Sequence, residues 1–228
     1  MGLGLEVGIL ADLKSADEEG YKYFSGQFSR INTLLAAKRL GQHCEPEEVD
    51  ELFSCSMIGY SGLHYLRRIA MHIVIAQSMP PPGTRDNYMA EDIGREYYLD
   101  IASGEDLEFQ HLVMHSDTEG FYIPVDFMEV IDSPDILGEY LGSTHRLREE
   151  CKALAAALEI PASLSHESTA LFTALDRQLA DGQESKTPVS RGQAEPRWQS
   201  YAVETHACLH LLAACEVSLR NKAAIVFC

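Results

Sequence analysis

Residues 198–228 have the sequence WQSYAVETHACLHLLAACEVSLRNKAAIVFC, and this stretch decides the fold class. Its first part repeats buried-type residues at steps of three and four, which predicts a helix with one buried seam. The seam residues are Trp198, Tyr201, Thr205, Cys208, Leu212, Cys215 and Leu219. The closing residues 224–228, AIVFC, predict a short apolar strand buried inside a sheet. This stretch therefore predicts a fold that combines helices with a sheet.

Other strand candidates lie at the start and in the middle of the chain. Residues 3–11 are rich in β-forming side chains, and residues 107–115 and 121–127 flank the turn sequence SDTEG. The last two segments predict a central β-hairpin with Gly120 in its loop. Pro124 has no amide hydrogen, so we expect the second strand to lie at a sheet edge or to carry a bulge.

Helical patterns occupy most of the remaining chain. The expected helices begin at a capping box at Ser15, after Pro46, at Ser61, at Ser143, at Ser165 and at Trp198. Residues 181–197 are polar and rich in Gly and Pro, which predicts a mobile loop. No regular β-α-β alternation is present, which argues against a dinucleotide-binding fold.

These patterns predict a mainly helical α+β protein with a single domain over residues 1–228. Its helices are expected to pack on a small mixed or antiparallel sheet. That sheet would consist of the N-terminal strand, the central hairpin and the C-terminal strand.

The charge is strongly negative and unevenly distributed. The chain has 228 residues with 35 Asp and Glu against 18 Lys and Arg, a net charge of −17. Residues 86–139 hold 15 acidic residues and one basic residue, Arg95, so this segment carries −14 over 54 residues. Such a surface disfavours nucleic acids and anionic membranes as partners, and it favours a basic protein.

The sequence also indicates a cellular location. No apolar run approaches the length of a membrane span, and no secretory signal precedes the first helix. None of the six cysteines forms a CxxC pair, so we interpret them as reduced thiols. We therefore expect a cytoplasmic protein. No catalytic or cofactor motif is recognised, and the oligomeric state is left open.

The leading functional hypothesis is an acidic protein-binding module. The contacts to a basic partner would come from the predicted hairpin and its flanks, where charge complementarity and acid–Arg pairs give affinity. The candidate partner-binding residues are Asp117, Glu119, Asp126, Glu129, Asp132 and Asp135. A structural or adaptor subunit is a further alternative.

An alternative hypothesis is a metal-dependent or acid-base enzyme of the hydrolase class. It would use His111, His115, Asp117 and Glu119, because two nitrogens on one strand face and two turn carboxylates suit a divalent metal. A structural role for both histidines is the competing interpretation. His206 and His210 also have a chelating i, i+4 spacing, but the surrounding seam favours a position flanking the core.

Four pieces of the chain carry a resemblance to a known group. They are YSGLHYLRR at 60–68, HSDTEGFYIPVDF at 115–127, LGS at 141–143 and KAAIVFC at 222–228. Together they resemble a mostly uncharacterised family of bacterial cytosolic proteins. The profile is also similar to immunity proteins of bacterial toxin systems, which are small, acidic and without catalytic motifs. The resemblance implies an inhibitor that binds and neutralises a basic toxin or effector.

Overall fold

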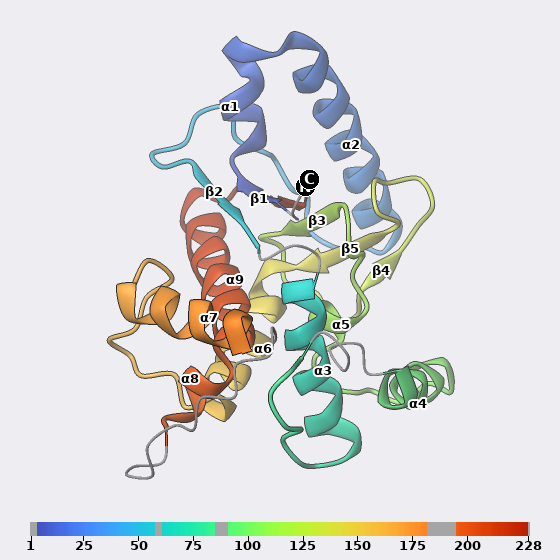
Figure 1. The fold of residues 1–228 in the computed structure, drawn as a ribbon. Helices are drawn as coiled ribbons and strands as arrows, with labels where there is room; N and C mark the ends of the chain where they lie inside the picture. The colour runs from blue at the N-terminus through green and yellow to red at the C-terminus, as the bar shows by residue number, and fades with distance from the viewer. Residues whose placement is uncertain (1–3, 58–60, 85–90, 182–194, 228) are drawn as a thin grey trace. The chain divides into compact units, whose positions relative to one another are not determined.

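The computed structural model describes residues 4–57, 61–84, 91–181 and 195–227 (Figure 1). The elements are β1 (Gly4–Val7), α1 (Ile9–Ala16), α2 (Glu18–Ala37), β2 (Phe53–Ser56), α3 (Ser61–Ile75), α4 (Glu91–Ala102), α5 (Gln110–Val113), β3 (Gly120–Ile123), β4 (Ile131–Asp132), β5 (Tyr140–Ser143), α6 (Thr144–Ala157), α7 (Thr169–Asp181), α8 (Arg197–Ser200), α9 (Ala202–Asn221) and β6 (Ile225–Phe227). The predicted α+β class is confirmed. Among these described segments, none of the helices has the length and apolar character needed to cross a bilayer.

The strands form one mixed sheet in the order β2-β1-β6-β3-β5-β4. The β3–β5 pair is parallel, and the other four pairs are antiparallel. The strand predicted at residues 224–228 is confirmed as β6, which lies between β1 and β3 with all three residues buried. Residues from both ends of the described chain therefore meet in the middle of the sheet.

The chain forms two compact units. Unit 1 consists of Met1–Tyr60, Phe109–Glu150 and Leu211–Cys228, and it contains the sheet. Unit 2 consists of Ser61–Glu108 and Cys151–His210 and is helical. Helices α6 and α9 contribute residues to both units. One domain over residues 1–228 stays a prediction.

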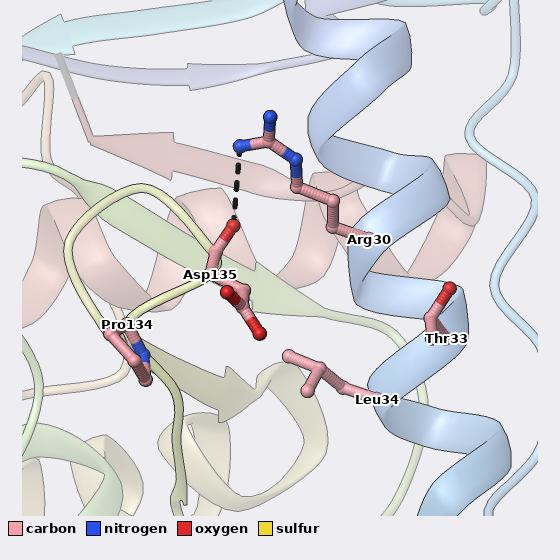
Figure 2. Close-up of a pocket in the computed structure, with 5 residues that line it drawn as sticks. All are labelled: Arg30, Thr33, Leu34, Pro134 and Asp135. Carbon is pink, nitrogen blue, oxygen red and sulfur yellow. Dashed lines mark hydrogen bonds between the residues drawn. The ribbon is translucent and has the colours of Figure 1, made fainter.

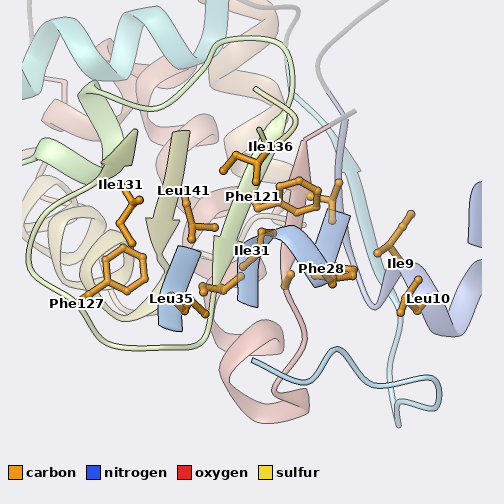
Figure 3. Packing of buried hydrophobic residues seen from close by; sticks show 13 residues of the cluster. Ile9, Leu10, Phe28, Ile31, Leu35, Phe121, Phe127, Ile131, Ile136 and Leu141 are labelled. Atoms are coloured by element: carbon orange, nitrogen blue, oxygen red, sulfur yellow. The ribbon is translucent and has the colours of Figure 1, made fainter. Parts of the chain in front are cut away.

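The core of unit 1 lies between α2 and one face of the sheet (Figure 3). Phe28, Ile31 and Leu35 recur along α2 at helical spacing and pack against strand residues that include Phe121 and Leu141. The N-cap of α2 is Asp17, whose carboxylate accepts hydrogen bonds from the backbone N–H groups of residues 19 and 20. The capping box predicted at Ser15 is wrong, because Ser15 lies inside the preceding helix α1.

The core of unit 2 includes the apolar row predicted for the helix after Gly62. Leu63, Leu66 and Ile69 of α3 are all buried. The buried side chain of Glu204 in α9 accepts a hydrogen bond from the backbone N–H of Gly83. The predicted mobile loop at 181–197 lies mostly outside the described residues, and its end, from Arg197, forms α8.

The predicted central hairpin is wrong in its first strand. Within residues 107–115 the chain forms the helical turn α5, and β3 pairs instead with β6 and β5. Both edges of β3 are therefore occupied, so the expected edge position or bulge is wrong too. Pro124 lies one residue beyond the end of β3, where its missing amide hydrogen leaves no gap in the ladder.

A second correction concerns residues 46–53. The predicted short helix is absent from this described stretch, and the chain runs instead into β2, which pairs antiparallel with β1. Strand β2 went unpredicted because its sequence, FSCS, places small polar residues at every second position. Pairing with β1 rather than local preference makes this segment a strand.

Candidate functional site

Carboxylates gather at one end of the sheet in unit 1. The parallel register matches Phe121 of β3 with Leu141 of β5. Glu119 immediately precedes β3 and Glu139 immediately precedes β5, so the two glutamates lie side by side. Asp132 ends β4 and lies opposite Tyr140, next to Glu139. Adjacent strands are about 4.8 Å apart. Three neighbouring strands thus bring one acidic residue each to the same end of the sheet.

The turn between β4 and β5, residues 133–139, adds a fourth acid and has a defined backbone. The backbone N–H of Ser133 donates to the carbonyl of Glu139 at 2.7 Å, and the Ser133 hydroxyl accepts from the N–H of Asp135 at 3.3 Å. Gly138 has φ +75°, and a Cβ there would clash with the carbonyl oxygen of Glu119. Only glycine fits this close approach between the two acidic segments.

Helix α2 holds this turn from the side. The side-chain oxygen of Gln27 accepts a hydrogen bond from the N–H of Leu137 at 3.0 Å. Nη1 of Arg30 donates to the carbonyl oxygen of Asp135 at 3.3 Å. Ile136, which lies between Asp135 and Leu137 in the sequence, is buried in the hydrophobic core under α2. The acidic turn is therefore anchored to the framework by one apolar and two polar contacts.

We call Glu119, Asp132, Asp135 and Glu139 the acidic end. All four residues are exposed. Within the part of the chain that the structure describes, no basic side chain forms an ion pair with any of them. Four uncompensated charges on adjacent backbone segments create a local negative potential that attracts a cationic surface.

Sequence reasoning identified three of the four. Glu119, Asp132 and Asp135 were predicted partner-binding residues, whereas Glu139 was not singled out. Its place beside Glu119 follows from the parallel β3–β5 register, which pairs residues 20 apart. No local sequence pattern carries that information.

The other predicted partner-binding residues lie elsewhere in unit 1. Asp117 is half-buried. Asp126 and Glu129 follow the opposite end of β3, and Nε and Nη2 of Arg146 donate to the two carboxylate oxygens of Asp126 at 2.6 and 3.1 Å. Arg146 therefore compensates the charge of Asp126 within unit 1. The six predicted residues therefore do not form one group.

His111, a ligand in the alternative enzyme hypothesis, is a buried structural residue. Its Nδ1 accepts a hydrogen bond from the N–H of Ser143 at 3.0 Å, so its proton is on Nε2, which donates to the carbonyl of Met128 at 3.1 Å. Burial lowers the pKa of His111 to about 4, which keeps the ring neutral. Both ring nitrogens of His111 have hydrogen-bond partners within the protein.

His115 is likewise surrounded by the protein. Its Nδ1 lies 3.2 Å from the carbonyl oxygen of Ser116, its Nε2 lies 3.1 Å from that of Phe121, and its ring stacks on Tyr122 at 4.1 Å. In residues 4–57, 61–84, 91–181 and 195–227, no three His, Cys, Asp or Glu side chains are arranged to hold a metal ion. The geometry gives the metal-dependent alternative no support.

Glu150 is a polar residue that sequence reasoning missed. Its two carboxylate oxygens accept hydrogen bonds from the N–H groups of His111 and Leu112, at 3.0 and 2.8 Å, and so cap the first turn of α5. Burial raises the pKa of Glu150 to about 8, against the lowering effect of these two hydrogen bonds. Glu150 thus fixes the segment that leads into Glu119.

Two histidines of α9 are neighbours in unit 2, as their i, i+4 spacing predicts. The ring centroids of His206 and His210 are 4.0 Å apart, and both residues are buried. Among the described residues, Nδ1 of His206 has no hydrogen-bond partner. Burial and the neighbouring His210 and His166 lower the pKa of His206 to about 4. This pair flanks the core, as the competing interpretation proposed.

The acidic segment 86–139 is divided between the two units. Its residues up to Glu108 belong to unit 2, where Asp92 and Glu96 are exposed on α4, and the rest belongs to unit 1. Each unit has an acidic surface of its own.

Comparison with protein-family models gives a match over nearly the whole chain. The model described as "Putative DNA-mimic protein" matches residues 1–227. Comparison with curated proteins and with solved structures finds no match.

Proposed function

Because the chain belongs to this putative DNA-mimic family over nearly its whole length, we propose that it is a protein-binding module whose acidic end takes the place of DNA phosphates. Its partner would be a DNA-binding protein with a basic face. The sequence predicts a basic protein partner, and the proposal narrows this partner to a DNA-binding protein.

The observation that carries the proposal is the acidic end itself. DNA-binding proteins contact phosphates mainly through Arg and Lys, and these contacts supply most of their sequence-independent affinity. Glu119, Asp132, Asp135 and Glu139 offer carboxylates to the same side chains, and none of them forms an ion pair with a basic side chain in the described part of the chain. The exposed carboxylates of the acidic end support binding in which they take the place of phosphates.

The fixed backbone of the acidic turn also supports the proposal. The hydrogen bonds of Gln27 and Ser133 hold residues 133–139 in one conformation. A preformed array of charges loses less conformational entropy on binding than a flexible acidic tail does. This is the arrangement needed to compete with a duplex, whose phosphates are themselves regularly spaced.

Release by DNA tests the proposal. The immobilised protein is exposed to a lysate of its source organism at low salt, and bound proteins are eluted with double-stranded DNA or with polyglutamate of equal charge. We expect DNA to release DNA-binding proteins at lower charge concentration than polyglutamate. Equal release by both polymers, or no retention, would contradict DNA mimicry.

A matched pair of variants locates the surface. The variant E119Q/D132N/D135N/E139Q removes the acidic end, and D92N/E96Q/E105Q/E108Q removes four exposed charges from unit 2. We expect the first to abolish DNA-releasable retention and the second to retain most of it. The reverse pattern would place the binding surface in unit 2.

The immunity-type inhibitor is a narrower form of this proposal. A toxin that cleaves DNA is a DNA-binding protein, and occupation of its basic substrate face by the acidic end would neutralise it in the cytoplasm. The acidic composition and the resemblance stated above support this form. If the retained protein is a nuclease, loss of its DNA cleavage on addition of the wild-type chain, but not of the acidic-end variant, is the expected result.

A further inference from the structure

A pocket of about 410 Å³ opens directly beside the acidic end, between α2 and the β4–β5 turn (Figure 2). Arg30, Thr33 and Leu34 of α2 line one side, and Pro134 and Asp135 of the turn line the other. Figure 2 shows the Leu34 side chain between the helix and the turn, with Arg30 reaching toward the backbone of Asp135. The pocket therefore combines apolar walls with two opposite charges.

We propose that this pocket receives an arginine or lysine side chain of the protein partner. The proposal rests on the proposed function and adds to it a defined anchor position. The aliphatic stem of such a side chain would lie on Leu34 and Pro134, and its cationic head would reach the carboxylate of Asp135. Arginine is also among the residues that most often dominate interface energies.

Local charge decides between a cationic and an anionic occupant. Arg30 alone would favour an anion. Asp135 lines the pocket, Glu139 lies in the same turn, and Asp132 immediately precedes it, so three acids outnumber Arg30. None of the three forms an ion pair with a described basic side chain. The field at the pocket is therefore net negative, and a cation is favoured.

The walls of the pocket are held in place before any partner arrives. Gln27 fixes Leu137, and Ile136 is buried in the core, so Pro134 and Asp135 stay near α2. Thr33 donates its hydroxyl hydrogen to the carbonyl of Ser29 within the helix at 3.0 Å, so its side chain is also fixed. An incoming side chain would meet a preformed pocket.

Small probes test the pocket without the partner. Nα-acetyl-arginine amide and Nα-acetyl-lysine amide are titrated into the ¹⁵N-labelled protein, with the neutral Nα-acetyl-norleucine amide as control. We expect saturable shifts of the Leu34 and Asp135 amides with both cations, and affinity at least threefold weaker with norleucine. Absence of these shifts, or equal shifts with norleucine, overturns the proposal.

Two substitutions give effects of opposite sign. Asp135→Asn should weaken cation binding about threefold, as expected for a partly exposed ion pair. Arg30→Gln keeps a donor for the Asp135 carbonyl but removes the repelling charge, so it should tighten cation binding about twofold. Asp176→Asn, an exposed acid of unit 2, is the charge control and should change nothing. Weaker cation binding by Arg30→Gln overturns the proposal.

The pocket titration and the DNA-release experiment can fail independently of each other. If DNA releases the partner but the cationic probes do not perturb the pocket, the pocket proposal falls and DNA mimicry stands. If the probes bind as expected but DNA releases no partner, the pocket binds cations and DNA mimicry falls.

Discussion

The side chain of Gln27 in α2 accepts a 3.0 Å hydrogen bond from the backbone N–H of Leu137, a residue 110 positions further along the chain. Gln27 is buried, and Leu137 is partly buried against the core of unit 1. This contact joins the helix that covers the sheet to the turn that carries the acidic end. A neutral side chain therefore controls the geometry of a charged surface.

Replacement of Gln27 by Leu should loosen the acidic turn without changing any charge. The N–H of Leu137 would lose its acceptor, at a cost of about 1–2 kcal/mol in the free energy of unfolding. Urea denaturation measures this cost, and amide hydrogen exchange should quicken across residues 133–139. Ser29→Ala, on the exposed face of the same helix, should do neither. Unchanged exchange in the turn would contradict the role given to Gln27.

Two glycines with positive φ offer a matched comparison. Gly138→Ala meets both an unfavourable φ of +75° and a clash with the Glu119 carbonyl. Gly104→Ala has a similar φ, +86°, but open space around the added methyl group. We expect about 1–2 kcal/mol of destabilisation for Gly104→Ala and clearly more for Gly138→Ala. Equal losses in thermal or urea unfolding would show that the β3 and β5 ends are less closely packed than described.

Stability should depend on the ionisation of Glu150. Its pKa is raised from 4.5 to about 8 in the folded chain, so the folded state binds more protons between these values. The contribution of protonated Glu150 to the free energy of unfolding is present in full below pH 4.5. It is lost as the pH rises toward 8, by up to about 1.4 kcal/mol per pH unit.

The measurement for Glu150 compares wild type with Glu150→Gln in urea at pH 5.0, 6.0, 7.0 and 7.5. The free energy of unfolding of the wild type, relative to the variant, should fall across this series. Parallel pH curves for the two proteins would show that the carboxylate titrates normally.

The lowered pKa of His206 should make stability depend on pH in the opposite direction. Its pKa is lowered to about 4 by burial, so the unfolded chain binds more protons between pH 6.5 and 4 and stability is lost as the pH falls. His206→Leu removes this titration and the unpartnered Nδ1, and should raise the free energy of unfolding at pH 5 by about 1 kcal/mol. His145→Leu, at a half-buried position of α6, controls for the change of residue type. A pH profile unchanged by His206→Leu would contradict the assignment.

Local patterns predicted those parts of the fold that local forces decide. The apolar row of α3 and the strand β6 follow from periodicity and from the density of β-forming residues. Residues 107–115 were assigned to the wrong class because the deciding group, the Glu150 carboxylate, lies 38 and 39 residues away from the N–H groups it caps. Intrinsic preference is weak over so short a segment, and the distant cap overrides it.

In the candidate site, too, local sequence predicts some features and distant contacts decide the others. Sequence charge identified Glu119, Asp132 and Asp135 as binding residues, because a local excess of acid is visible in one chain. It did not separate them from Asp126, whose charge is compensated by Arg146, 20 residues away. Ion pairing and strand register are long-range properties, and they select which acids of an acidic segment face a partner.

The central place of β6 has a consequence for biosynthesis. While a ribosome adds the roughly 80 residues between Ser143 and Phe227, the β1–β2 pair and the β3–β5–β4 group have no strand to join them. At an elongation rate of about 5–20 residues per second this interval lasts about 4–17 s, and during it two inner strand edges lack their partner. Nascent chains stalled before Ile225 should therefore depend on chaperones and be cleared by proteases, so translation of the last strand commits the whole sheet to fold.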